Sequence, residues 1–154
     1  MGYTTDFYGA IKVEPPLSAA EVDYLTKFSE SRRERRAEGP YFVDSNSQNS
    51  NSPADGQPGL WCQWIPTPNG IEWDGGEKFY GAADWMKYLI EQFIGSRPKA
   101  RGQRYVPELP GHVCNGVIEA RGEEGDDHWL LIVENNVVKI AQARPAQFGE
   151  AELV

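Results

Sequence analysis

The feature that most constrains the fold is an alternation of apolar and polar side chains at the start of the chain. Within residues 3–13, apolar side chains such as Phe7 and Ile11 alternate with polar ones such as Asp6 and Lys12. Successive side chains of a strand point to opposite faces of a sheet, so a period of two is typical of a strand that is buried on one face. The segment is therefore predicted to be a half-buried strand, which ends at the two prolines that follow it.

A capping motif marks the start of the first helix. Ser18 is followed three residues later by Glu21, the spacing at which each side chain hydrogen-bonds to the backbone of the other. We predict a helix from this point to the stop signal at Gly39. Acidic residues are interleaved with the arginines of its last part, so that part is expected to be a solvated helix face. These arginines are Arg32, Arg33, Arg35 and Arg36.

Periodicity and turn signals predict the remaining elements. In residues 82–93 apolar side chains recur at helical spacing, and Gly95 follows as a stop signal. The Asn-Gly pair that begins at Asn69 joins two short apolar runs, which predicts a β-hairpin. Strands are predicted at residues 60–65, 70–73, 112–120, 128–134 and 137–142.

Together these elements predict one domain of the α+β class, an antiparallel sheet of about five or six strands with two main helices packed on it. A chain of 154 residues fits a single domain. Residues 1–142 are expected to form this domain, with a flexible loop at residues 45–58 that is too polar to pack. Residues 143–154 are expected to be a loosely held tail.

Charge and cysteine content restrict the classes of function. The 23 acidic and 15 basic residues give a net charge of -8, which repels a phosphate backbone, so nucleic-acid binding is not expected. Cys62 and Cys114 lie in apolar runs and are too few for a disulfide framework, so both are expected to be reduced and buried. No apolar run is long enough to span a membrane and no secretion signal is found, which predicts a cytoplasmic protein. No cofactor is expected.

The densest group of side chains suited to ligand binding lies at the centre of the chain. Four of the five tryptophans fall between positions 61 and 85, next to several carboxylates. Such a group can form a pocket that stacks a planar ring and hydrogen-bonds to its edge. The alternative explanation is a sheet core built from cross-strand aromatic pairs. The candidate ligand-binding residues are Trp61, Trp64, Glu72, Trp73, Asp74, Glu77, Lys78 and Tyr80.

Motifs for catalysis and for metal binding are not found in the sequence. Glu72, Asp74 and Glu77 are suited to serve as the acid and base of a hydrolase, yet no sugar-binding or nucleophile motif accompanies them. The acidic turn at residues 123–127 lacks the ligand spacing of a calcium-binding loop. No catalytic residue and no metal ligand is therefore assigned.

Three stretches of the sequence carry a family resemblance. They are the start MGYTTDF (residues 1–7), the block GLWCQW (residues 59–64) and the block IEWDGGEKFY (residues 71–80). They resemble an uncharacterised family found in bacterial and phage genomes. Members of that family usually carry an aromatic-Gln-Gly-Glu sequence where this chain has ARGE at residues 120–123. No activity is established for the family, so the resemblance implies an accessory protein that moves between phage and host genomes, and it implies no mechanism.

These observations favour a non-enzymatic protein that binds a protein partner or a small planar ligand through an acidic, tryptophan-rich hairpin. One alternative is a hydrolase that uses the carboxylates of residues 72–77. A second alternative is a self-associating structural component, whose exposed aromatic side chains are buried against other copies of the chain. The sequence leaves the oligomeric state open.

Overall fold

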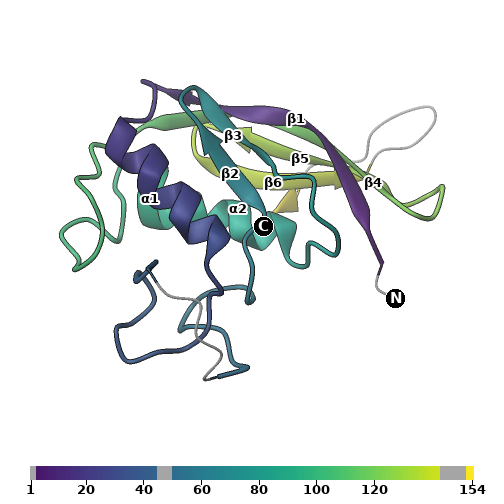
Figure 1. The fold of residues 1–154 in the computed structure, drawn as a ribbon. Helices are drawn as coiled ribbons and strands as arrows, with labels where there is room; N and C mark the ends of the chain where they lie inside the picture. Colours follow the sequence, from purple (N-terminus) through teal and green to yellow (C-terminus); the bar gives the residue numbers. More distant parts are fainter. Residues whose placement is uncertain (1–2, 45–49, 143–151) are drawn as a thin grey trace.

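The computed structural model describes residues 3–44, 50–142 and 152–154, and it has an α+β fold (Figure 1). A seven-stranded antiparallel sheet has the strand order β2-β3-β1-β4-β5-β6-β7. The strands are β1 (Thr5–Glu14), β2 (Trp64–Thr67), β3 (Gly70–Trp73), β4 (Val113–Gly122), β5 (His128–Glu134), β6 (Val137–Gln142) and β7 (Glu152–Leu153). The helices are α1 (Ala19–Glu30), α2 (Ala82–Leu89) and the π-helical turn η1 (Ile90–Ile94).

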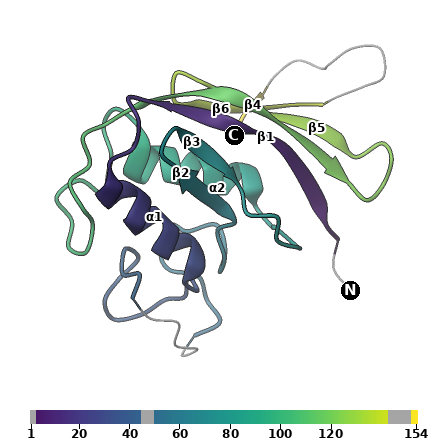
Figure 2. The ribbon, with the colours of Figure 1, turned by 45° about the horizontal axis from the view of Figure 1, so that its top comes forward.

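Both helices lie on one side of the sheet, as two views of the ribbon show (Figures 1 and 2). β1 is central and pairs with β3 on one side and with β4 on the other. Its side chains Phe7, Ile11 and Val13 are buried on the helix side, which confirms the alternation predicted for this segment. The fold class is therefore as predicted, with a sheet of seven strands where five or six were expected.

Helix α1 begins at the predicted capping box. The Glu21 amide donates to Ser18 Oγ over 3.1 Å, and the Ser18 amide donates to Glu21 Oε1 over 2.9 Å. The helix ends at Glu30, nine residues before the predicted stop at Gly39. The sequence signal for the start was local, whereas the end is set by contacts with distant segments.

The arginine-rich segment after α1 corrects the prediction of a solvated helix face. Arg33 is fully buried, with its guanidinium 4.4 Å from the centroid of the Phe28 ring. It donates to the Phe42 carbonyl and to Ser31 Oγ, both over 2.6 Å. Burial lowers the pKa of Arg33 to about 10, so the side chain keeps its charge at neutral pH. The Phe42 carbonyl comes from nine residues further along the chain, beyond the end of the helix, which is why no helical pattern revealed it.

Part of the polar loop is packed rather than loose. Ala54 and Gln57 are buried, although the whole of residues 45–58 was expected to be too polar to pack. The Ala54 amide donates to the Arg33 carbonyl over 3.0 Å, and the Ser50 amide donates to Glu34 Oε2 over 2.8 Å. These hydrogen bonds to the arginine-rich segment hold this part of the loop in place, although it has few apolar side chains to pack. Residues 45–49 lie outside the described residues.

The second predicted helix forms α2 and continues into η1. Trp85, Met86, Leu89 and Phe93 are buried, as their helical spacing predicted. The backbone widens into a π-helical turn at residues 90–94, where the Gly95 amide donates to the carbonyl five residues earlier over 2.7 Å. Gly95 ends the helix, as expected.

Two segments, residues 60–65 and the C-terminal segment, differ from what the sequence predicted. The run predicted as a strand from residue 60 pairs in the sheet only from Trp64 onward. At the other end of the chain, Glu152 and Leu153 pair with β6 as the short strand β7, within the segment expected to be a loose tail. Residues 143–151 of that segment lie outside the described residues. Among the described helices, none has the length and apolar character needed to cross a membrane.

Candidate functional site

The five tryptophans, all of them in the described part of the chain, divide into core residues and one exposed residue. Trp64 and Trp85 are fully buried, and Trp73 and Trp129 are partly buried. The Trp64 indole donates to the Ala82 carbonyl over 2.8 Å and packs edge-on against Phe7. The structure thus places Trp64 in the core between the sheet and α2, where the packing explanation applies and contact with a ligand is blocked.

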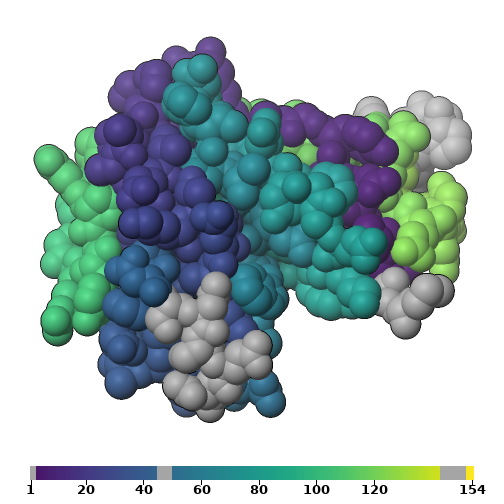
Figure 3. All heavy atoms as spheres, in the orientation of Figure 1, coloured from purple at the N-terminus to yellow at the C-terminus, as the bar shows by residue number. Residues whose placement is uncertain are grey.

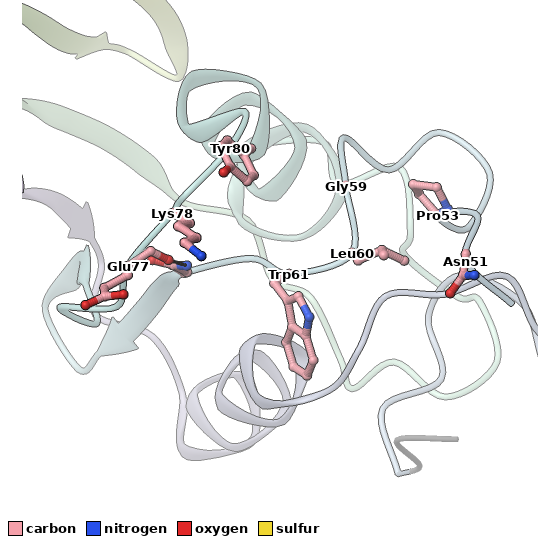
Figure 4. A pocket seen from close by; sticks show the side chains of 9 residues that line it. Asn51, Pro53, Gly59, Leu60, Trp61, Glu77, Lys78 and Tyr80 are labelled. Atoms are coloured by element: carbon pink, nitrogen blue, oxygen red, sulfur yellow. Dashed lines mark hydrogen bonds between the residues drawn. The ribbon is translucent and has the colours of Figure 1, made fainter. Parts of the chain in front are cut away.

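Trp61, in contrast, is 46 % exposed and separates two hollows in the surface. The first, here called the Tyr80 hollow, has a volume of about 510 Å³. It is lined by Asn51, Pro53, Gly59, Leu60, Trp61, Gln63, Glu77, Lys78 and Tyr80 (Figure 4). The second, here called the α1 hollow, has a volume of about 770 Å³ and is lined by Thr26, Ser29, Glu30, Trp61, Cys62, Gln63, Ile65, Pro66 and Asp74.

These hollows lie where three parts of the chain meet on one face of the molecule. Figure 3 shows α1, the segment that follows it and the segment around residues 60–80 side by side on this face. In Figure 4 the Trp61 ring extends toward α1, with Lys78 and Tyr80 on one side of it and Leu60 and Pro53 on the other. The site is therefore assembled from segments that are far apart in the sequence.

The neighbours of Trp61 are anchored, which leaves its side chain directed outward. The Leu60 carbonyl accepts a hydrogen bond of 2.7 Å from the Arg33 amide. Cys62 is buried, and desolvation raises the pKa of its thiol to about 12. Alternation along this extended run then puts Trp61 and Gln63 on the side opposite to Cys62 and the core.

Gln63 belongs to the candidate site, although the sequence analysis did not select it. Its Oε1 accepts from Trp73 Nε1 over 3.2 Å, and its Nε2 donates to the Glu77 carbonyl over 2.7 Å. Its backbone carbonyl accepts from the Asp74 amide over 3.0 Å. Gln63 lines both hollows and ties the hairpin to the turn that carries Glu77. Its place on the same strand side as Trp61 was the one signal available in the sequence.

The turn after β3 positions the polar rim of the Tyr80 hollow. Asp74 Oδ1 accepts from the Gly76 amide over 2.7 Å, which closes the turn. Lys78 adopts a positive φ of 57°, which redirects the chain toward α2. Glu77, Lys78 and Tyr80 are consequently all exposed at the rim.

The three carboxylates of the hydrolase hypothesis do not converge on one place. Glu72 lies opposite Ile65 on the hairpin and lines neither hollow. Asp74 lines the α1 hollow and Glu77 lines the Tyr80 hollow. All three are exposed to water, whereas a pair of catalytic carboxyl groups faces one substrate bond from two sides.

Acidic and histidine side chains elsewhere have structural partners. The Tyr3 hydroxyl donates to Asp127 Oδ2 over 2.7 Å, so the acidic turn is tied to the start of β1. His112 Nε2 lies 2.8 Å from Glu21 Oε2 in the core. Within residues 3–44, 50–142 and 152–154, no group of three or more His, Cys, Asp or Glu side chains is arranged to hold a metal ion.

The Tyr80 hollow therefore combines an exposed indole, apolar walls and a rim with one cation and one carboxylate. Of the eight predicted residues, Trp61, Glu77, Lys78 and Tyr80 line the Tyr80 hollow, and Asp74 lines the α1 hollow with Trp61. Trp73 supports the site from behind through Gln63. No protein-family model, no curated protein and no solved structure matches this chain.

Proposed function

We propose that this chain is a non-enzymatic binding protein that holds a small planar ligand against the indole of Trp61. The observation that carries the proposal is the exposure of Trp61 between two hollows, while the other tryptophans are fully or partly buried. Large exposed aromatic surfaces are costly in water, and a site that stacks a ring against one removes that cost.

The size and chemistry of the Tyr80 hollow support a ligand of this kind. Its volume of about 510 Å³ falls within the roughly 300–1,000 Å³ of small-molecule sites. Leu60, Pro53 and Trp61 supply apolar contact for a ring. Lys78 and Glu77 supply a donor and an acceptor for polar groups on the ring edge. A planar heterocycle with hydrogen-bonding substituents fits this combination.

The experiment is a thermal-shift screen with nucleobases, nucleosides and aromatic amino acids, followed by calorimetric titration of each compound that raises the melting temperature. Trp61→Ala should weaken binding of such a compound at least tenfold, because it removes the stacking surface. Trp61→Phe should keep most of the affinity.

Tyr8→Ala is the matched control for this experiment. Tyr8 is 52 % exposed, about as much as Trp61, but it lies on the other side of the sheet from the helices. The control should bind like the wild type. The proposal is overturned if no planar compound binds, or if Trp61→Ala binds such a compound as tightly as the wild type does.

The hydrolase alternative receives less support, because Glu72, Asp74 and Glu77 are exposed and line different places. Substituting each of them by its amide separates the two functions. A hydrolase loses turnover of a chromogenic substrate on one such substitution, whereas a binding protein changes only its affinity.

We propose that the chain acts in the cytoplasm and that it has an accessory role connected with phage. Two free, buried cysteines support a reducing compartment. The phage connection is supported by the sequence blocks MGYTTDF, GLWCQW and IEWDGGEKFY.

A further inference from the structure

The side of the sheet that faces away from the helices carries an apolar surface. Strand register places Ala10, Val117 and Ile132 next to one another on β1, β4 and β5. Tyr8 and Leu130 flank Glu119 in the neighbouring row. Tyr8 is 52 % exposed and Val117 is 50 % exposed. These five residues are here called the outer sheet face. Contiguous exposed apolar surface of this kind marks interaction sites.

The charged side chains around the outer sheet face largely neutralise one another. Lys12 pairs with Glu14 at 3.0 Å, Arg121 with Glu119 at 3.1 Å and Lys139 with Glu134 at 3.8 Å. Asp6 lies directly opposite Arg121 in the register of β1 and β4. Glu72 is exposed on β3, on the same side of the sheet. Three basic and five acidic side chains thus leave this side with a net charge of about -2, whereas the whole chain carries -8.

The small net charge of this side of the sheet favours a second copy of the chain as the partner. Two copies of a chain with a charge of -8 repel each other through most of their surface. The repulsion is smallest where charges are already paired, and an apolar centre there gains from burial against an identical apolar centre. An arrangement around a two-fold axis brings the same patch of each copy together.

The geometry of the sheet also favours association through its face and not through its edge strands. The edge strand β2 contains Pro66, which has no amide hydrogen to donate, and the opposite edge strand β7 has two residues. Four strands about 4.8 Å apart and about eight residues long cover roughly 500 Å² of flat area. Protruding side chains enlarge the accessible area toward the ~800 Å² per partner that specific interfaces bury.

We propose that two copies of the chain form a symmetric dimer by packing their outer sheet faces against each other. Sheets that pack in this way lie about 10 Å apart, with apolar side chains of both faces interdigitated. The dimer leaves the Trp61 site free, because that site lies on the helix side of the sheet.

Sedimentation equilibrium over a range of concentrations tests this proposal. The wild type should approach twice the chain mass of 17.3 kDa. Val117→Glu puts an unpaired charge at the centre of the interface and should raise the dissociation constant at least tenfold. Tyr8→Lys, at a half-exposed position that tolerates substitution, should act in the same direction even if Val117→Glu impairs folding.

Ala20→Glu is the matched control, since it adds the same charge at an exposed position of α1. It should leave the dimer intact, and so should Trp61→Ala, which keeps this test separate from that of ligand binding. A wild type that stays monomeric at high concentration overturns the proposal, whether or not another protein occupies the face. A dimer that persists in both Val117→Glu and Tyr8→Lys also overturns it.

Discussion

At the scale of single residues, one buried polar pair links the start of α1 to the start of β4. Glu21 uses Oε1 for the capping box and Oε2 for a contact of 2.8 Å with His112 Nε2. His112 Nδ1 lies 2.7 Å from the Pro15 carbonyl, which only accepts, so Nδ1 carries a hydrogen. Both side chains are 1 % exposed. The pair therefore depends on a complete set of hydrogen bonds for its stability.

His112→Ala should lower the free energy of unfolding by about 3 kcal/mol or more, because it leaves a buried carboxylate without its partner. Glu21→Gln should cost less, about 1 kcal/mol, because an amide retains hydrogen-bonding capacity toward Ser18 and the imidazole. Urea denaturation followed by circular dichroism measures both values.

The other histidine provides the control for this prediction. His128 is partly exposed and bonds to Glu119 at the surface over 2.9 Å. His128→Ala should change the free energy of unfolding by less than about 1 kcal/mol. Equal losses in His112→Ala and His128→Ala would contradict the role given to the buried pair.

At the scale of elements, the segment after α1 organises a loop that the sequence left unstructured. Glu34 is buried and accepts from Arg32 at 3.1 Å and from Arg36 at 3.4 Å. The same carboxylate accepts from the Ser50 amide. Pro53, which lines the Tyr80 hollow, is bridged to Glu34 through the backbone. The wall of the candidate site thus depends on this ionic cluster.

Glu34→Ala should therefore destabilise both the fold and the loop. The substitution removes the buried carboxylate that Arg32 and Arg36 share. This should lower the free energy of unfolding by about 3 kcal/mol. Hydrogen exchange should become faster at the amides of Arg35 and Ala54. These amides donate hydrogen bonds between the segment after α1 and the loop, to the carbonyls of Ser52 and Arg33.

Glu38→Ala is the control, because Glu38 is exposed on the same segment. It should change stability by less than about 0.5 kcal/mol. If the two variants have the same stability and the same exchange rates, the cluster does not organise the loop.

At the scale of the whole molecule, sheet and helices share one core rich in aromatic rings, thiols and phenols. Phe28 of α1 packs edge-on against Trp85 of α2 and against Phe93 of η1. Desolvation raises the pKa of Cys62 and of Cys114 to about 12. Burial also raises the pKa of Tyr88 to about 12 and that of Tyr24 further still.

These shifts predict unfolding in alkali. A group with a raised pKa in the folded state keeps its proton there, while the unfolded chain loses it, so stability falls as pH rises. The free energy of unfolding should be flat up to about pH 9 and then fall toward pH 12. The lowered pKa of Arg33 opposes this fall above about pH 10, but it is one group against four. Each deprotonating group contributes a slope of up to about 1.4 kcal/mol per pH unit within this window.

Urea titrations between pH 7 and pH 11 would measure this dependence, with phenolate absorbance to follow the tyrosines. Cys62→Ala and Cys114→Ala each remove one titrating group and should make the decline less steep. A free energy of unfolding that stays constant up to pH 11 would contradict the burial of these groups.

The candidate site was predictable only in part. Alternation places Trp61 on the face opposite to Cys62 and Trp64, but it does not show which of the two faces is buried. Local spacing did not reveal that Trp61 stays exposed while Trp64 enters the core, because this depends on which surface α2 covers. The contribution of Asn51 and Pro53 was missed because residues 45–58 contain almost no apolar side chains.

The sequence by itself determined the start of α1, the strands on either side of the acidic turn, the burial pattern of β1 and the α+β class. Each of these rests on periodicity, capping or turn chemistry among residues a few positions apart. Only the tertiary structure decided the early end of α1, the burial of Arg33 and Glu34, and the assembly of the Tyr80 hollow. A charged side chain is buried only when distant segments supply its hydrogen-bond partners, and those partners come together only in the folded chain.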